Sequence, residues 1–270
     1  MQRALTDPLI SVYAWLNRRK VFDVPLLQSL FVRSYFFYKS HFEDPFLHLI
    51  AARPQLFTRG HLLDIGANIG YTAVIFARSL GAGDRVFAFE PEKRNFHRLV
   101  ENLARFGVGD RVIANFLAVG AVNGTVDLWL NELHPGDHRI VTGAFRERIQ
   151  SGNSVSPVPM VTIDSFVQSN QISNHIGFIK IDVQGFETEV CRGMEQTLLL
   201  NPRAVVAIEY APGPMTELGF RAQELMDFFV ERGFHLYELE RRGRVRMVAA
   251  NQVQVEAGGW ITLLCSREQL

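Results

Sequence analysis

From His61 onward, short apolar runs alternate with segments whose apolar residues recur at helical spacing. Strand–helix alternation of this kind requires right-handed crossovers, and it predicts an α/β fold with a mainly parallel sheet and helices on both faces. The runs predicted as the seven strands of this sheet are Leu62–Ile65, Arg85–Glu90, Val112–Val119, Ile176–Val183, Ala204–Tyr210, Phe234–Leu239 and Trp260–Cys265. The segments predicted as helices are Tyr71–Leu80, Glu92–Phe106, a short one near Ser165, Glu187–Leu199 and Arg221–Arg232.

Two parts of the chain depart from this alternation. The last two predicted strands are separated by a stretch without a clear helical period, so we expect them to pair antiparallel at one side of the sheet. After the third predicted strand, GTVDLWLN and VPMVTID flank a long polar loop. These segments predict a β-hairpin inserted at about 120–163, on the ligand side of the sheet.

Residues 1–58 lack strand-like alternation and are predicted to form a helical N-terminal extension before a domain of residues 59–270. The segment DPFLHLIAARPQLF predicts a helix capped at Asp44, with Pro45 at its first position. We expect these helices to cover one edge of the core. The alternatives are a lid over a substrate pocket, an arm that joins two copies into a homo-oligomer, and a helix on a membrane surface.

Charge and cysteine content exclude several classes of protein. The chain has 28 basic and 28 acidic residues, so it lacks the excess positive charge of a nucleic-acid-binding protein. Its two cysteines, Cys191 and Cys265, are too few for a disulfide framework or a cysteine zinc site. The apolar stretch LISVYAWL has the wrong flanking residues for a secretory signal, and no run approaches the ~20 apolar residues of a membrane span. We expect a cytoplasmic protein that binds no nucleic acid.

The stretch HLLDIGANIGYTAVIFA places a carboxylate and two glycines where a predicted strand meets a predicted helix. In a parallel sheet, ligands bind beyond the carboxyl ends of the strands. Glycine there lets backbone N–H groups approach a ligand, whereas Asp64 suits an ammonium or sulphonium charge. The residues of this turn that are predicted to bind a cofactor are Asp64, Gly66, Asn68, Gly70, Tyr71 and Thr72. The alternative is a tight connection that binds nothing.

Glu90 ends the second predicted strand. An acid at this strand tip can accept hydrogen bonds from both hydroxyls of a ribose. It is also favoured by the dipole of the helix that follows Pro91, and the two roles are compatible. The turn itself reads D-x-G-A-N-x-G and lacks the third glycine of the G-x-G-x-x-G pattern that admits a pyrophosphate. The spacing therefore disfavours a dinucleotide.

Together with FIKIDVQGFETEVCRGM, AVVAIEY and PMVTIDSF, these segments resemble the FkbM family of S-adenosylmethionine-dependent class I methyltransferases, over roughly residues 60–265. The resemblance implies a Rossmann-like fold, S-adenosylmethionine as cofactor, and methyl transfer, typically to a hydroxyl of a sugar or polyketide-like molecule. Gln184 stands where many relatives have glutamate, and we assign it no catalytic role. The third strand lacks the acid common in class I enzymes, so we expect backbone near Ala118 to contact adenine.

Methyl transfer is an in-line displacement in which the cofactor supplies the electrophile and the protein aligns the acceptor and removes its proton. Asp182 and Glu209 end adjacent predicted strands and should converge beside the methyl donor. One would contact the cofactor's amine while the other acts as base. Alternatively both would bind Mg²⁺, although Tyr210 occupies the place of a third ligand in catechol-type enzymes. Lys180 either lies in this site or forms a buried ion pair.

The loop HPGDHRI contains His134, Asp137, His138 and Arg139 within one turn. We expect His138 and Arg139 to bind the acceptor, with His138 also a candidate base near neutral pH. The alternatives are a metal site and a solvated loop in which Asp137 caps the turn. Four other histidines stand at element ends and are interpreted as surface or packing residues: His61, His97, His175 and His235.

The leading hypothesis is O-methylation of a small-molecule acceptor such as a sugar, a polyketide or a related natural product. N- or C-methylation is an alternative, because the cofactor half of the site does not identify the accepting atom. A nucleotide-dependent oxidoreductase is disfavoured by the missing glycine and by Asp64. An inactive cofactor-binding module is disfavoured by the joint presence of Asp64, Glu90 and Asp182.

Overall fold

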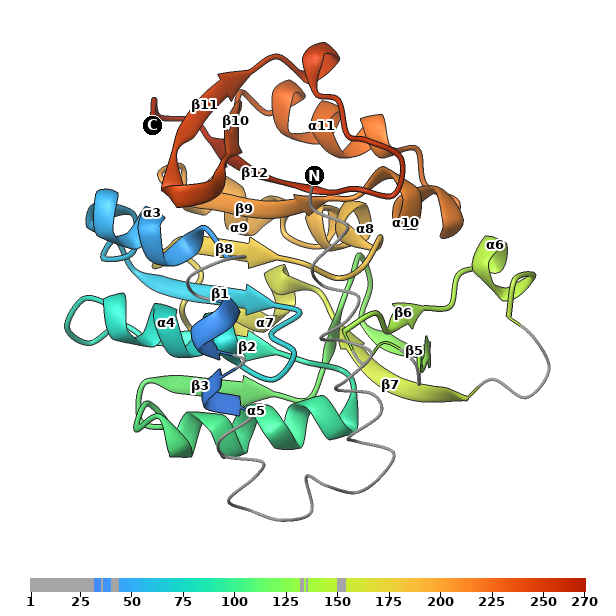
Figure 1. Cartoon of the computed structure of the whole chain (residues 1–270), viewed down its shortest axis with the longest axis horizontal. Coiled ribbons are helices and arrows are strands. Elements are labelled where there is room, and N and C mark those ends of the chain that lie inside the picture. The colour runs from blue at the N-terminus through green and yellow to red at the C-terminus, as the bar shows by residue number, and fades with distance from the viewer. Residues whose placement is uncertain (1–31, 35, 40–43, 132–133, 135, 150–153) are drawn as a thin grey trace.

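The computed structural model describes residues 32–34, 36–39, 44–131, 134, 136–149 and 154–270, so the expectations for residues 1–31 lie outside it. The fold is α/β, as predicted, with a main sheet and a smaller second sheet (Figure 1). The main sheet has eight strands in the order β11-β10-β12-β9-β8-β1-β2-β3, one strand more than the sequence pattern predicts.

Five neighbouring strands of the main sheet run parallel. They are β1 (His61–Ile65), β2 (Val86–Phe89), β3 (Val112–Asn115), β8 (Ile176–Ile181) and β9 (Val205–Tyr210). Every residue of β2 and β8 is buried. Strands buried on both faces have near-continuous apolar sequences, and this is the pattern of a parallel sheet that helices cover on both sides.

The other three strands of the main sheet form its antiparallel side. The strand β12 (Ile261–Ser266) lies between β9 and β10 (His235–Leu239) and runs antiparallel to both, which confirms the predicted pairing of the last two strands. The unpredicted strand β11 (Val245–Val248) pairs with β10 at the sheet edge. Its residues are half-buried or exposed, so it lacks the apolar run that marks a buried strand.

Helices cover both faces of the main sheet, as predicted. The first face carries α3 (Phe46–Ala52), α4 (Tyr71–Ser79) and α5 (Lys93–Arg105). The second face carries α7 (Ile163–Ser169), α8 (Glu187–Arg192), α9 (Glu195–Leu200), α10 (Pro212–Glu217) and α11 (Ala222–Glu231). Leu62 belongs to the core of the first face and Leu63 to that of the second, because successive residues of a strand point to opposite sides. The short elements η3 (Pro54–Leu56), η4 (Arg241–Gly243) and η5 (Ala250–Gln252) lie in connections.

The segment predicted as one helix from Glu187 to Leu199 forms two helices, α8 and α9, that are separated at Gly193. A Cβ atom at Gly193 would lie 2.0 Å from the carbonyl oxygen of Gly120. The backbone after β4 therefore approaches the end of α8 so closely that only glycine fits there.

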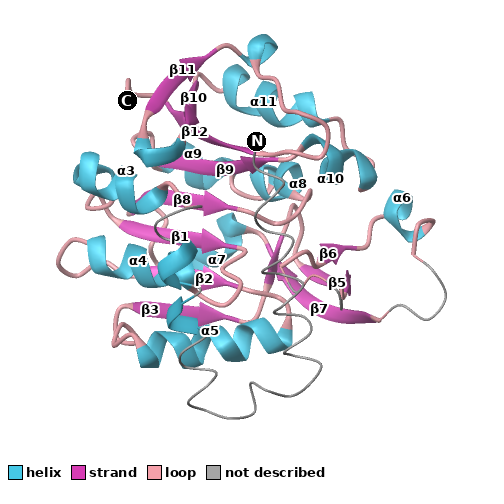
Figure 2. Ribbon diagram, viewed as in Figure 1, coloured by secondary structure: helices cyan, strands magenta, loops and turns pink. Residues whose placement is uncertain are grey.

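The predicted third strand, Val112–Val119, is also divided in two. Residues of β3 stay in the main sheet, whereas β4 (Ala118–Val119) enters the second sheet, whose order is β4-β7-β5-β6. In that sheet, β5 (Gly124–Trp129) pairs antiparallel with β7 (Val155–Val161) and with β6 (Arg139–Ile140), which precedes the short helix α6 (Gly143–Arg146). The insertion is thus larger than the predicted hairpin, and Figure 2 shows it beside the carboxyl ends of the parallel strands.

The described part of the N-terminal segment packs on the first face. The carboxylate of Asp44 accepts a hydrogen bond from the Phe46 N–H (2.7 Å), and the helix begins at Phe46 rather than at the predicted Pro45. The rings of Phe46 and Phe57 contact Phe76 and Phe178. Among the described residues, no helix has both the length and the apolar character needed to cross a membrane.

Candidate active site

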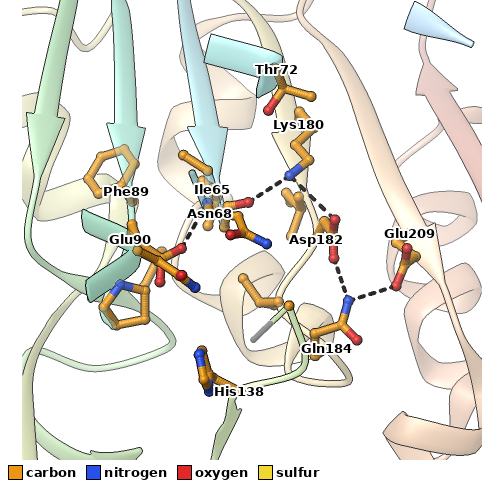
Figure 3. A pocket seen from close by; sticks show the side chains of 18 of the residues that line it. Ile65, Asn68, Thr72, Phe89, Glu90, His138, Lys180, Asp182, Gln184 and Glu209 are labelled. Atoms are coloured by element: carbon orange, nitrogen blue, oxygen red, sulfur yellow. Dashed lines mark hydrogen bonds and ion pairs between the residues drawn. The ribbon is translucent and has the colours of Figure 1, made fainter. Parts of the chain in front are cut away.

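A cavity of about 310 Å³ opens at the carboxyl ends of β1, β2, β8 and β9. Residues of β1, β2, β8 and β9 form its floor, and Leu128 and Ile140 of the second sheet close one side. Figure 3 shows Glu90 on one side of the cavity, Asp182, Gln184 and Glu209 on the other, and Asn68 between them. The cavity therefore lies where ligands bind in open parallel sheets.

The glycine turn after β1 joins neighbouring strands closely. Gly66 has a φ of 78°, and a Cβ atom there would lie 1.8 Å from the carbonyl oxygen of Asp182. The N–H groups of Gly66 and Ala67 both donate to the carbonyl of Phe89, at 3.0 and 2.9 Å. These two backbone N–H groups are thus used within the protein.

Asp64 has a different position from the one predicted. Its side chain is fully buried (0% exposed) and is not among the residues that line the cavity. Its Oδ2 accepts a hydrogen bond from the Thr72 hydroxyl (2.6 Å), and its Oδ1 lies 3.5 Å from the Lys180 ammonium. Asp64 therefore holds Thr72 and Lys180, both of which do line the cavity.

Gly70 is likewise absent from the cavity lining. It precedes α4 with a φ of 88°, and a Cβ atom there would lie 2.6 Å from Leu99. Its place in the sequence pattern is explained by the packing of α4 against α5. The remaining predicted cofactor residues line the cavity: Gly66, Asn68, Tyr71, Thr72, Glu90, Ala118 and Asp182.

Glu90 is buried at the tip of β2. Its two carboxylate oxygens accept hydrogen bonds from the N–H groups of Asn68 (2.8 Å) and Glu92 (2.9 Å). Burial raises the pKa of Glu90 to about 7, although these hydrogen bonds oppose the shift. Each carboxylate oxygen can accept a further hydrogen bond, so the group can bind two hydroxyls in the cavity.

Asp182 and Glu209 converge, as predicted, and Gln184 connects them. The Gln184 amide nitrogen donates to Asp182 Oδ1 (2.8 Å) and to Glu209 Oε1 (3.2 Å) (Figure 3). Gln184 has a φ of 56°, and the turn after β8 thereby directs its side chain between the two acids. A Mg²⁺ ion shared by these carboxylates would need the space that this amide group occupies, so the arrangement does not favour the magnesium alternative.

Lys180 is the buried cation of the site. Its ammonium donates to the Gly66 carbonyl (2.8 Å) and lies 3.5 Å from a carboxylate oxygen of both Asp64 and Asp182. These two acids raise the pKa of Lys180 even though burial opposes the shift. Lys180 therefore both lines the cavity and forms buried ion pairs, so the two alternatives are compatible.

Glu209 differs from Asp182 in its electrostatic surroundings. Burial, followed by the nearby charges of Asp182 and Glu187, raises the pKa of Glu209 well above its usual range. Asp182 is the member of the pair that is open to the cavity, with 32% of its side chain exposed. Of the two predicted catalytic acids, Asp182 is thus better placed to accept a proton, and Glu209 is better suited to hold one.

The inserted loop brings His138 to the cavity but not Arg139. The guanidinium of Arg139 forms ion pairs with Asp137 (2.6 Å) and with Glu217, so the placement does not support direct acceptor binding by Arg139. His138 Nδ1 accepts a hydrogen bond from the Asn131 N–H (3.1 Å), and burial lowers the pKa of its imidazole. The neutral ring therefore carries its proton on Nε2, which makes His138 a hydrogen-bond donor rather than a base.

Sequence patterns assign no role to Gln184, Trp260 and Thr262, although all three line the cavity. Thr262 lies directly opposite Glu209 in the pairing of β12 with β9. The two residues are neighbours because β12, the last strand, lies between the earlier strands β9 and β10. The local sequence does not reveal this strand order. A polar residue within the apolar run of β12 was the available signal.

Comparison with known proteins places the chain in a family. The model of the methyltransferase FkbM domain matches residues 64–236. The hexuronic acid methyltransferase AglP of Haloferax volcanii is 30% identical over 139 residues, which are 51% of this chain and 51% of that protein. A probable cobalt-precorrin-6B C(15)-methyltransferase of Pyrobaculum calidifontis is 28% identical over 147 residues, which are 51% of this chain and 69% of that protein. The chain thus spans about half the length of the first of these relatives.

Solved structures with a similar fold include two methyltransferases. The FkbM methyltransferase of Methylobacillus flagellatus has a TM-score of 0.46 at 15% identity, with 77% of this chain and 43% of that chain covered. The O-methyltransferase of Bacillus cereus has a TM-score of 0.47 at 18% identity, with 95% and 98% covered. The family model, which matches more than half of the sequence, confirms the resemblance seen in the motifs: the chain belongs to the FkbM family of S-adenosylmethionine-dependent methyltransferases.

Proposed function

We propose that this protein transfers a methyl group from S-adenosylmethionine to a hydroxyl group of a small molecule. The observation that carries the proposal is one cavity with Glu90 on one side and the Asp182–Gln184–Glu209 array on the other. The first side suits the ribose of a nucleoside cofactor. The second offers the carboxylate of Asp182 for a hydroxyl that must lose its proton.

In this proposal, Glu90 accepts hydrogen bonds from the ribose hydroxyls, and the backbone at Ala118 contacts adenine. The cofactor's amino-acid part lies toward Asn68 and Thr72. S-adenosylmethionine supplies the electrophilic methyl group. Asp182 accepts the proton of the acceptor hydroxyl, while Lys180 and Gln184 hold its carboxylate in place.

The acceptor occupies the side of the cavity that is closed by the second sheet. Leu128 and Ile140 supply apolar contacts there, and His138 supplies a donor. One curated relative is named for hexuronic acid, so hexuronic acid glycosides are the first acceptors to test, beside the matching neutral hexosides. The assay incubates the protein with S-adenosylmethionine and each acceptor and measures the methylated product by mass spectrometry. Binding of NADH without binding of S-adenosylhomocysteine would overturn the proposal.

Glu90→Gln is expected to weaken the binding of S-adenosylhomocysteine. With a pKa of about 7, Glu90 is mostly protonated at pH 6, and a protonated carboxyl has lost part of its capacity to accept hydrogen bonds from ribose. The affinity of the wild-type protein should therefore rise about tenfold from pH 6 to pH 8. Calorimetric titration across this range measures it. Glu231→Gln, an exposed change on α11, should keep the wild-type profile, and an equal profile in Glu90→Gln would remove Glu90 from the cofactor site.

His138→Ala is expected to raise the KM for the acceptor by up to about tenfold, the effect of one lost hydrogen bond. Affinity for S-adenosylhomocysteine should stay within a factor of two or so, because His138 lies on the acceptor side. Steady-state kinetics and calorimetry separate the two effects. The exposed His97→Ala on α5 is the matched control. A large loss of cofactor affinity with unchanged acceptor kinetics would contradict this placement.

A further inference from the structure

Three side chains that can bind metals lie at the edge of the main sheet opposite the cavity. His61 begins β1, Asp84 precedes β2, and His175 immediately precedes β8. Because β1 lies between β2 and β8, all three side chains meet at the amino ends of adjacent parallel strands. A ligand atom of each lies within 4.8 Å of those of the other two.

The carboxylate of Asp84 is the centre of this cluster. Its Oδ1 lies 2.8 Å from His175 Nε2 and 3.5 Å from His61 Nδ1. The two imidazole rings are perpendicular, with centroids 4.9 Å apart. One carboxylate oxygen thus faces a nitrogen of each ring, and separations near 3–3.5 Å are those expected between neighbouring ligands of one ion with metal–ligand bonds of about 2.0–2.2 Å.

Backbone hydrogen bonds hold the three positions in place before any ion binds. The His61 N–H donates to the His175 carbonyl (2.8 Å), and the Leu62 N–H donates to the Arg85 carbonyl (3.0 Å). The cluster therefore rests on the sheet rather than on mobile side chains alone. Preorganisation of this kind lowers the entropic cost of binding.

The cluster is open to solvent on one side. The side chain of His175 is 56% exposed, whereas those of His61 and Asp84 are 13% and 8% exposed. An ion could enter from the His175 side and keep water in its remaining position. The nearby cation, Arg85, donates from its guanidinium to the Asp110 carbonyl (2.6 Å), so it is held by another partner.

We propose that His61, Asp84 and His175 form a Zn²⁺ site that links the amino ends of β1, β2 and β8. Two imidazoles and a carboxylate are borderline-soft ligands of the kind that Zn²⁺ takes, with a fourth position left for water. Binding at His61 Nδ1 would replace the hydrogen bond from the Arg85 N–H (3.1 Å). This exchange opposes binding, so the affinity is expected in the micromolar range rather than the nanomolar range.

The ion would act on stability rather than on methyl transfer. A strand such as β8 (Ile176–Ile181) rises about 3.3 Å per residue, so its two ends are separated by roughly 17 Å. The site is therefore too far from the cavity to contact a cofactor, and it is independent of the proposed function. Its expected effect is a higher melting temperature of the whole chain, because an ion that binds only the folded state stabilises it.

The experiment uses the full chain without a histidine tag, freed of metal by a chelator and then dialysed. Equilibrium dialysis against ZnCl₂ with elemental analysis should give one Zn²⁺ per chain at tens of micromolar. His175→Ala and Asp84→Asn should each weaken binding at least tenfold. The exposed His235→Ala, which leaves the cluster intact, should bind as the wild type does. Equal binding by the wild type and His175→Ala, or no binding at 100 µM ZnCl₂, would overturn the proposal.

A second measurement, of the melting temperature, tests whether the variant is folded. His175 is largely exposed, so His175→Ala should melt at the wild-type temperature in the presence of EDTA. Addition of ZnCl₂ should then raise the melting temperature of the wild type alone. Co²⁺ in place of Zn²⁺ should give visible absorption bands in the wild type that are lost in the variant, and bands of equal strength in both would also refute the site.

Discussion

Gly66→Ala is expected to cost more than about 4 kcal/mol in the free energy of unfolding, or to prevent folding altogether. The new methyl group would lie 1.8 Å from the carbonyl oxygen of Asp182, a backbone atom that cannot turn aside. The backbone at Gly66 also has a φ of 78°, which an alanine adopts only at a cost. Relief of the clash requires β1 and β8 to separate at the point where they form the floor of the cavity.

Chemical denaturation and titration with S-adenosylhomocysteine measure both consequences of this change. Gly83→Ala is the matched control, since Gly83 has a similar φ of 85° but no atom within 4 Å of a new Cβ. That variant carries the backbone cost alone, about 1–2 kcal/mol, and should keep the wild-type cofactor affinity. Equal losses of stability in the two variants would show that the contact between Gly66 and Asp182 is not the cause.

Asp182→Asn is expected to lower turnover by about 10²–10⁴-fold, the range for loss of a general base. The amide is nearly isosteric but cannot accept the proton of an acceptor hydroxyl. It also leaves the Lys180 ammonium with one carboxylate fewer within 3.5 Å. The melting temperature should change little, because the side chain is open to the cavity rather than enclosed in the core.

Single-turnover kinetics with saturating S-adenosylmethionine separates chemistry from binding in this variant. Asp127→Asn serves as control, since the side chain of Asp127 in β5 forms an exposed ion pair with Arg146 of α6. It should retain wild-type turnover, as surface ion pairs contribute little. A wild-type rate in Asp182→Asn would remove Asp182 from catalysis, and a fall in melting temperature as large as that of Gly66→Ala would assign it a structural role instead.

The parts of the fold that depend on local sequence could be predicted. Buried parallel strands are apolar runs, so β1, β2, β8 and β9 are visible in the sequence, and their carboxyl ends place Glu90, Asp182 and Glu209 around one cavity. The helices between these strands are predicted from the spacing of apolar residues, which is also a property of the local sequence. Exposed β11 lacks such a run and could not be found in this way.

Other features depend on contacts between distant segments. Asp64 lies within β1, before the turn that the sequence pattern marks, and its buried carboxylate faces the hydroxyl of Thr72 and the ammonium of Lys180. The guanidinium of Arg139 pairs with Glu217, far along the chain, which removes it from the acceptor side. The sequence assigns Gln184 no role, and only its position between Asp182 and Glu209 shows that its amide connects the two acids.

After Asn115 the chain leaves the main sheet, and β4 begins the second sheet only three residues later. Described residues from β4 to β6 contribute walls and a histidine to the cavity without supplying a strand to the sheet that carries Glu90 and Asp182. Under the proposed function, exchange of the part of this segment that follows β4 would alter which acceptors fit, while Ala118 and the rest of the donor half stay unchanged. A library restricted to it is therefore the economical route to variants with new acceptors.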